Sequence, residues 1–249
     1  MAHAEHRLAA ARADPAGVVL EGFHALKHAL RFGADLVGAW TADPDGLARM
    51  AAELAPDLEL DGIVEPVAAA ALGAHAHHTA VLAVARRPAF DPAAVGAGPV
   101  VLLEDPRHPG NVGAVVRVAA AAGAAAVLTT GAQDPWDRAA LRGSAGLHFA
   151  LPVGRLDDAW LGGRPLVALD PGAAPLAALP PDALLAFGTE RHGLSPALLA
   201  RADARVGIPM RPGVSSLNLA TAVAVVLYIE RSGFSQRSIV QTGRMPTDS

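Results

Sequence analysis

A short apolar run, a helix-forming segment and a second apolar run follow one another without a gap between residues 99 and 130. The first run, Pro99–Glu104, is rich in Val and Leu, and Asn111 stands where a side chain can cap a helix that continues to Ala122. Gly123 ends that helix, and the second apolar run, 124–130, begins at once. Because two strands joined by a helix pair in parallel, this unit predicts an α/β fold with a parallel sheet.

The same alternation continues towards the C-terminus and also precedes the unit. After it, the patterns predict helices at 136–143, 157–161, 195–200 and 216–230, and strands at 149–153, 165–169, 183–187 and 205–208. Before it, they predict strands at 18–20, 36–41 and 79–85, and helices at 22–32 and 45–54. We therefore predict a small α/β domain at 1–88, a linker at 89–98, a larger domain at 99–232 and a flexible tail at 233–249.

Small apolar residues dominate the composition, with 52% hydrophobic residues but only 4% aromatic ones. Such cores are built from Ala, Val and Leu, as in helices packed on a parallel sheet. The chain has no Cys, which excludes disulfides, thiolate metal sites and cysteine nucleophiles and fits a reducing compartment. Neither a signal-peptide pattern nor a run of ~20 strongly apolar residues is present, so we expect a cytoplasmic protein without a membrane partner.

The charge of the chain is unevenly distributed. Residues 1–95 carry 7 Lys and Arg against 12 Asp and Glu, whereas residues 96–249 carry 13 against 12, and the net charge is -4. Neither part is the basic footprint of a typical nucleic-acid-binding domain. Binding of RNA would therefore depend on a local group of arginines.

Three polar segments each begin at the end of a predicted strand, where open α/β sheets bind their ligands. They are Asp105–Arg117, Phe187–Pro196 and Ile208–Asn218. Much of their composition has a structural explanation, because Asn111, Ser195 and Ser216 can each cap a helix. Helix capping does not explain two other residues as well. Glu190 lies in a loop flanked by glycines, and Asn218 is a poor helix former placed in a first turn.

Common cofactor and metal motifs are missing. The Gly96-Ala-Gly98 pair precedes a strand instead of following one, so it cannot form a dinucleotide-binding turn, and the chain has neither a P-loop nor an H-E-x-x-H motif. Histidines do occur in two groups, one on a helix at His24 and His28 and one in a loop at 75–78. Since the spacing defines no further ligand, we expect no metal.

Taken together, the three segments resemble the motifs of the SpoU (TrmH-like) RNA ribose methyltransferases of the SPOUT superfamily. The residues that match the three motifs are Asp105, Pro106, Asn111, Gly113 and Arg117; Gly188, Glu190, Gly193, Leu194 and Ser195; and Ile208, Pro209, Met210, Ser216, Leu217 and Asn218. Thr189 and Arg191 depart from the Asn and Gly that are usual in the second motif. Ser144–Gly146 also resembles a family segment, and the block 18–85 is similar to the family's ribosomal-protein-like substrate-binding domain.

The resemblance implies a parallel-sheet fold whose C-terminal part forms a trefoil knot, and a homodimer packed through the last helix and the helix of the first motif. It also implies bound S-adenosylmethionine (SAM) and transfer of its methyl group to a ribose 2′-hydroxyl of rRNA or tRNA. The residues implied to bind SAM are Phe187, Gly188, Thr189, Glu190, Gly193, Ile208, Met210, Ser216 and Leu217. Those implied in catalysis are Asn111, Arg117, Glu190, Ser216 and Asn218.

We expect Arg117 to clamp an RNA phosphate and to stabilise the developing alkoxide, because a guanidinium does not readily give up its proton. Three alternatives stay open at this point. The chain could be an RNA-binding protein that keeps the fold without catalysis, or a different enzyme on an ordinary doubly wound sheet. It could also methylate a base nitrogen, as another SPOUT branch does.

Overall fold

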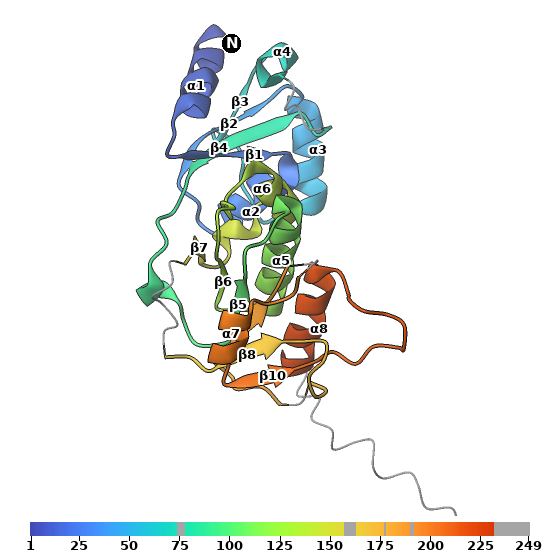
Figure 1. Ribbon diagram of the computed structural model, residues 1–249. Helices are drawn as coiled ribbons and strands as arrows, with labels where there is room; N and C mark the ends of the chain where they lie inside the picture. The colour runs from blue at the N-terminus through green and yellow to red at the C-terminus, as the bar shows by residue number, and fades with distance from the viewer. Residues whose placement is uncertain (74–77, 157–162, 177, 190–191, 232–249) are drawn as a thin grey trace, which may run out of the picture.

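The computed structural model describes residues 1–73, 78–156, 163–176, 178–189 and 192–231, which form two sheets covered by helices (Figure 1). The elements of the first part are α1 (Ala2–Ala13), β1 (Gly17–Glu21), α2 (Phe23–Arg31), β2 (Leu36–Thr41), α3 (Pro44–Leu54), β3 (Val64–Pro66), α4 (Ala69–Leu72) and β4 (Val81–Arg86). Those that follow are the 3₁₀ helix η2 (Pro92–Ala94), β5 (Val100–Leu103), α5 (Pro109–Ala122), β6 (Ala126–Thr129), α6 (Arg138–Ser144), the 3₁₀ helix η3 (Leu147–Phe149), β7 (Val153–Arg155), β8 (Leu166–Leu169), β9 (Leu184–Phe187), α7 (Pro196–Arg201), β10 (Ala204–Val206) and α8 (Leu219–Arg231).

The larger sheet has six strands in the order β10-β8-β9-β5-β6-β7, and every pair is parallel. The parallel sheet predicted from residues 99–130 is therefore confirmed, with β5, α5 and β6 in the expected order. Gly123 ends α5 in the left-handed conformation at φ 73°, where a glycine is favoured.

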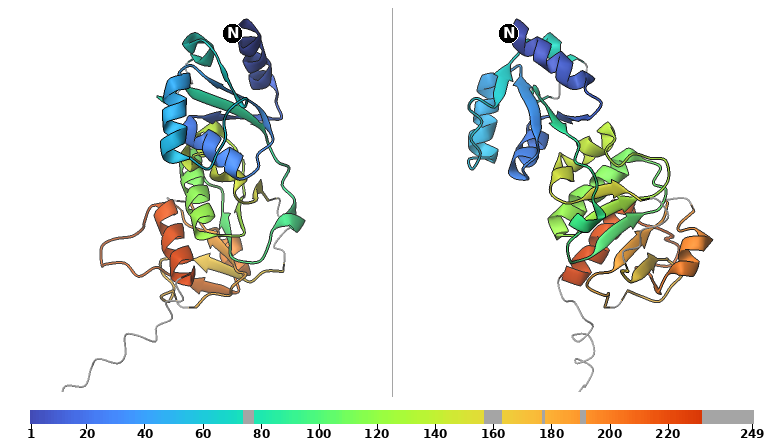
Figure 2. Two further views of the ribbon diagram at one scale, coloured as in Figure 1. Left: turned by 180° about the vertical axis from the view of Figure 1, so that it is seen from behind. Right: turned by 90° about the vertical axis from the view of Figure 1, so that its left-hand side faces the viewer.

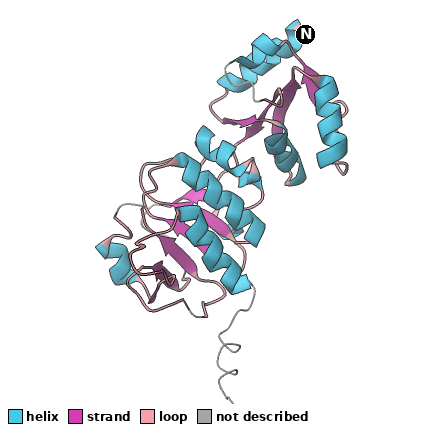
Figure 3. Cartoon of the chain, turned by 90° about the vertical axis from the view of Figure 1, so that its right-hand side faces the viewer, coloured by secondary structure: helices cyan, strands magenta, loops and turns pink. Residues whose placement is uncertain are grey.

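Both faces of the larger sheet are buried. Alternate residues of β5 point to opposite sides, so that Val101 and Leu103 pack with α5 and α8 while Val100 and Leu102 pack with Leu198 of α7. Strands buried on both faces are expected to be continuously apolar, as these are. Helices α5 and α8 lie side by side on one face (Figure 3).

The smaller sheet has four strands in the order β1-β4-β2-β3, with β4 antiparallel to both of its neighbours and β3 parallel to β2. On one face Leu8 of α1 and Leu72 of α4 pack around Trp40. On the other face Leu26 of α2 and Leu47 of α3 contribute to the main core. Figure 2 shows this unit next to the body that holds the larger sheet.

Several elements differ from the sequence predictions. Helices α1 and α4 and strand β3 were not predicted, because α1 is rich in polar residues and the other two are only four and three residues long. The strand predicted at 149–153 is wrong: Gly146 turns the chain at φ 79° into η3, and the strand β7 begins only at Val153. The helix predicted from 136 begins at Arg138, because the Asp137 side chain accepts a hydrogen bond from Ala139 N and caps it. The predicted helix 157–161 and the predicted tail 233–249 lie outside the described residues.

Close contacts join the two sheet-bearing parts at α2 and α6. The His28 Nδ1–H donates to Ala145 O at 2.8 Å, and Arg138 forms an ion pair with Glu21. A methyl group at Gly146 would lie 2.6 Å from Ala25 O, so the backbones touch there. The domain boundary predicted at residue 88 falls between β4 and η2.

Among the described residues, none of the helices combines the length and the apolar character that a membrane crossing requires.

Candidate active site

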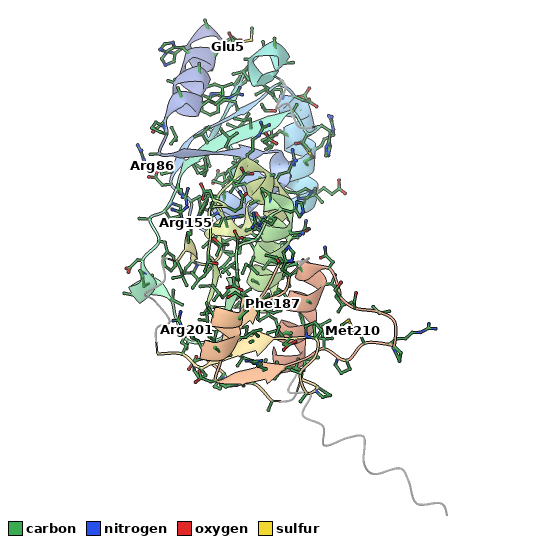
Figure 4. The ribbon with its side chains drawn as sticks, viewed as in Figure 1. Glu5, Arg86, Arg155, Phe187, Arg201 and Met210 are labelled. Carbon is green, nitrogen blue, oxygen red and sulfur yellow. The ribbon has the colours of Figure 1, made fainter. Side chains whose placement is uncertain are left out.

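A cavity of about 310 Å³ opens at the carboxyl ends of three neighbouring strands, β8, β9 and β10. Its described lining residues are Leu169, Asp170, Pro171, Phe187, Gly188, Thr189, Gly193, Val206, Ile208, Met210, Ser215, Ser216, Leu217, Leu219 and Ala222. They come from the loops that leave the three strands and from the first turns of α8. Figure 4 labels Phe187, at the end of β9, and Met210, in the long loop that leads to α8.

The second and third polar segments therefore meet in space. All but one of the residues implied to bind SAM line this cavity: Phe187, Gly188, Thr189, Gly193, Ile208, Met210, Ser216 and Leu217. The remaining one, Glu190, lies outside the described residues. Two loops that are about twenty residues apart in sequence thus form the walls of one pocket.

The second loop closes tightly on itself. Thr189 N donates to Gly193 O at 3.1 Å, and Gly193 N donates to Thr189 O at 3.0 Å. A methyl group at Gly188 would lie 2.0 Å from the carbonyl carbon of Gly193, which no side chain can tolerate. Glycine at 188 is thus a requirement of the close backbone approach, and it leaves one wall of the cavity formed by main chain.

Glu104 holds this loop in place and was not identified from the sequence. Its carboxylate accepts one hydrogen bond from Ser195 N and one from Ser195 Oγ, both at 2.6 Å. The Ser195 side chain also caps α7 by accepting from Leu198 N at 3.1 Å, as predicted. The sequence did contain a signal for this role, because Glu104 is an acidic residue at the end of an apolar strand and directly precedes the first motif.

The start of the first motif differs from its prediction. Helix α5 begins at Pro109 with His108 at its N-cap, so Asn111 lies in the first turn and the prediction that it caps the helix is wrong. Proline fits the first helical position because its fixed φ is already helical and its missing N–H is not needed there. Asn111 and the exposed Arg117 are not among the described residues that line the cavity.

The third motif also differs in its cap. Helix α8 begins at Leu219, and Asn218 Oδ1 accepts from Ala220 N at 3.0 Å and from Thr221 N at 3.4 Å. The prediction that Ser216 caps this helix is therefore wrong, and Asn218 does so, in keeping with the preference of Asn for this position. Ser216 instead lines the cavity, whereas Asn218 does not.

Asp170 is the one ionisable side chain among the described lining residues. It follows β8, and its Oδ1 accepts a hydrogen bond from Gly172 N at 2.9 Å. The sequence analysis did not select this residue, since no motif includes it. Its carboxylate gives the pocket a negative charge, which suits a cationic ligand.

Metal ligands are not grouped in the part of the chain that the structure describes, where no three His, Cys, Asp or Glu side chains come together. His28 is engaged with Ala145 O, and burial lowers its pKa. The loop histidines at 75 and 77 lie outside the described residues.

Comparison with known proteins assigns the chain to a family. The model of the SpoU rRNA Methylase family matches residues 98–228, more than half of the chain. The chain belongs to this family. Membership of this family argues against the unrelated doubly wound enzyme that the sequence left open.

Relatives within the family are similar over different lengths. An uncharacterized tRNA/rRNA methyltransferase of Mycobacterium bovis is 36% identical over 211 residues, which cover 74% of this chain and 71% of that protein. The 23S rRNA (guanosine(2553)-2′-O)-methyltransferase of Bacillus subtilis is 34% identical over 140 residues, which cover 52% of this chain and 56% of that protein. The chain thus spans only about half the length of several curated relatives that it matches.

Structural similarity extends over nearly the whole chain. The crystal structure of the SpoU methyltransferase AviRb from Streptomyces viridochromogenes in complex with AdoMet has a TM-score of 0.73 at 25% identity. The match covers 93% of this chain and 97% of that one. The α/β fold with its parallel sheet is therefore that of the SPOUT methyltransferases.

Proposed function

We propose that this chain transfers the methyl group of SAM to a ribose 2′-hydroxyl of rRNA or tRNA. The observation that carries the proposal is the convergence of the second and third motif loops on one cavity at the carboxyl ends of β8, β9 and β10. Family membership supports it, as do a relative named as a 23S rRNA 2′-O-methyltransferase and a solved relative that holds AdoMet.

The cavity fits SAM on three observations. Phe187, Ile208 and Leu217 provide apolar surface for an adenine ring, while the close approach of Gly188 to Gly193 leaves backbone groups exposed to the ligand. Asp170 supplies the negative charge that a sulfonium attracts. When bound, SAM provides an electrophilic methyl group, and the role of this chain is to hold it and to exclude water from it.

Catalysis requires the 2′-hydroxyl to lie in line with the methyl group and to lose its proton. Alignment alone can lower a barrier by roughly 7–11 kcal/mol in favourable cases. We assign Arg117 to the RNA phosphate and the developing alkoxide, and Asn111, Glu190 and Ser216 to hydrogen bonds that orient the ribose and the methyl donor. Asn218 takes part by fixing the start of α8, next to Ser216 and Leu217.

A homodimer would bring these groups together. Asn111 and Arg117 are on α5, outside the cavity of their own chain, and α5 packs beside α8. Tyr228 on α8 is 48% exposed, and Leu217, before the helix, is 38% exposed, which suits a surface covered by a second copy. We propose that α5 and α8 form this interface, and that Arg117 of one copy serves the cavity of the other.

Three further parts of the proposal concern architecture and location. Residues 99–232 form the methyltransferase domain, with a trefoil knot in its C-terminal part, and residues 1–88 form a domain that binds the RNA substrate. The four-stranded sheet, separate from the six-stranded one, supports this division. An enzyme acting on rRNA or tRNA in this way would work in the cytoplasm.

The direct test is calorimetric titration with SAM, followed by transfer of tritium from methyl-labelled SAM to bulk rRNA and tRNA. Digestion of the product with a nuclease that needs a free 2′-hydroxyl then separates ribose methylation from base methylation. Resistance at one phosphodiester bond supports the proposal. SAM binding without transfer to any RNA would favour the non-catalytic alternative, and a nuclease-sensitive product would indicate a methylated base.

A further inference from the structure

Glu104 is bonded to both ends of the loop that walls the cavity assigned to SAM. Its backbone N–H donates to Phe187 O at 2.9 Å, where the loop leaves β9. Its carboxylate accepts the two hydrogen bonds from Ser195, where the loop reaches α7. One residue, directly after β5, therefore sets the distance between the two ends of the second motif.

The contact between Glu104 and Ser195 is of a strong kind. Both of its hydrogen bonds are 2.6 Å long, and each carboxylate oxygen takes one donor, since Oε2 accepts from the amide and Oε1 from the hydroxyl. Hydrogen bonds to a carboxylate are roughly twice as strong as bonds between neutral groups. Ser195 Oγ accepts in turn from Leu198 N, so the contact continues into the first turn of α7.

The chain on the other side of Glu104 is held rigidly. The next residue, Asp105, has a φ of 45°, which is unfavourable for a residue with a side chain. Its N–H donates to Thr130 Oγ1 at 3.0 Å, and a methyl group at Gly131 would lie 2.4 Å from its Oδ1. Backbone strain persists only where the surroundings fix the conformation. The Glu104 carboxylate therefore projects from a fixed point of the sheet.

A second carboxylate joins the same two strands at their other end. Asp182, before β9, accepts from Gly98 N, before β5, at 2.6 Å. The parallel ladder and this contact already align β5 with β9. The Glu104 carboxylate adds a bond beyond the strands, to the far end of the cofactor loop.

We infer that Glu104 is a positioning residue for the cofactor, which holds the loop 187–195 in the conformation that SAM binds. This inference rests on the proposed function and deepens it, because Glu104 is not among the described residues that line the cavity. Gly188, Thr189 and Gly193 do line it, and they lie between the two attachment points. A loop that is closed for only a fraction of the time binds its ligand more weakly in proportion to that fraction.

Glu104→Gln tests the carboxylate with little change of shape. The amide keeps one acceptor and turns an N–H towards the second Ser195 donor, so the loop should open more often. The dissociation constant for SAM should rise at least about fivefold, a size typical of a lost hydrogen bond to a charged group. S-adenosylhomocysteine should lose the same factor in calorimetric titrations, because both ligands need the closed loop. The KM for SAM should rise likewise, with kcat at saturating SAM and the KM for RNA unchanged.

Asp182→Asn is the matched control. It changes the carboxylate at the opposite end of β5 and β9, where no residue lines the cavity. This variant should bind both ligands as the wild type does, whatever its melting temperature. Wild-type affinities in Glu104→Gln would overturn the inference, because the loop would then close without the carboxylate. An equal loss in Asp182→Asn would also overturn it, since any weakening of the two strands would then have the same effect.

Amide hydrogen exchange of the wild type tests the inference without a variant. In the closed loop the Ser195 amide is bonded to Glu104 and the Gly193 amide to Thr189 O. Saturating SAM should slow exchange of both amides at least about tenfold, because opening then requires release of the ligand. The Gly98 amide, bonded to Asp182, should exchange at the same rate with and without SAM. If Glu104→Gln does not fold, this measurement decides, and unchanged exchange at Ser195 would overturn the inference.

The outcomes separate this inference from the proposed function. If the wild type methylates RNA and Glu104→Gln binds SAM equally well, the positioning role is wrong and the enzyme stands. If the wild type binds SAM but methylates no RNA, the proposed function fails, and the SAM affinities and exchange rates still test Glu104. If the wild type binds no SAM, both fail.

Discussion

A guanidinium is a poor general base, so in the proposed reaction Arg117 acts through its position and charge. It is exposed and lies on α5, outside the cavity assigned to SAM. This separation allows its contribution to turnover to be measured apart from cofactor binding.

Replacement of Arg117 by Ala should lower kcat at least about 100-fold, as loss of one transition-state donor does elsewhere. The affinity for SAM should be nearly unchanged. Single-turnover methylation and calorimetry measure the two quantities on the same preparation. Turnover equal to that of the wild type would remove Arg117 from the mechanism.

Asp170 should discriminate between substrate and product cofactor. SAM carries a sulfonium that S-adenosylhomocysteine lacks, and an attraction between opposite charges within one pocket is worth on the order of 1–2 kcal/mol at an effective dielectric constant near 20. In Asp170→Asn, the preference for SAM over S-adenosylhomocysteine should therefore fall about tenfold in calorimetric titrations. An equal loss of both affinities would show that Asp170 contacts a part that the two ligands share.

His148 makes the stability of the fold depend on pH. Its ring is 1% exposed, donates from Nε2 to Pro135 O at 2.9 Å and contacts Ser144 Oγ through Nδ1 at 2.7 Å. Burial lowers the pKa of His148 to about 4, from 6.5 in the unfolded chain. Between these values the unfolded chain binds a proton that the folded chain does not, so the free energy of unfolding falls as the pH falls from 6.5 to 4, by roughly 3 kcal/mol.

Urea unfolding of the wild type and of His148→Gln at pH 7, 5.5 and 4.5 tests this expectation. The variant should lose less stability on acidification, because its side chain does not titrate. Other titrating groups, His28 among them, cancel in the difference between the two proteins. Parallel pH profiles would contradict the assignment.

At the level of elements, helix packing depends on glycines that let backbones touch. A methyl group at Gly113 would lie 2.1 Å from Ala140 O, and one at Gly143 would lie 3.0 Å from Gly110 O. Helices α5 and α6 therefore pack closer than any side chain would allow. Helix α5 carries Arg117, and α6 contacts the small-sheet unit. The packing of α5 on α6 therefore sets the distance between Arg117 and the small-sheet unit.

Gly113→Ala should accordingly destabilise the protein by about 3 kcal/mol or more, because the clash is with backbone that cannot move aside locally. Gly110→Ala is the matched control on the same helix, since a methyl group there meets nothing within 4 Å. That variant should be as stable as the wild type or slightly more so, given the better helix propensity of Ala. Thermal unfolding of both variants measures the difference in stability. Similar melting temperatures for the two variants would be inconsistent with the close packing of α5 on α6 at Gly113.

For the whole molecule, the proposed dimer has a testable consequence, because in it Arg117 of one copy would complete the active site of the other. The wild type should therefore sediment as a dimer, and Tyr228→Glu, which places a charge on the exposed face of α8, should sediment as a monomer without activity. Tyr228→Phe is the control and should remain dimeric and active. A fully active monomeric wild type would show that each chain holds a complete site.

Local sequence determined the features that depend on backbone preference over a few residues. The unit 99–130, the stop at Gly123 and the cap at Ser195 follow from residue types in order, and so do the three loops after strands. The expectation that the chain binds SAM and acts on RNA came from the resemblance of the three motifs to those of the SpoU family.

Only the tertiary structure decided which side chains meet. Glu104 reaches Ser195 from 91 residues away, and Asp170 enters the pocket from a loop without a motif. Helices α2 and α5, more than seventy residues apart in sequence, both pack against α6 and η3. The choice between Ser216 and Asn218 as a cap followed from where α8 begins. Such contacts depend on the packing of whole elements, and the free energy of that packing is not encoded in any single stretch of sequence.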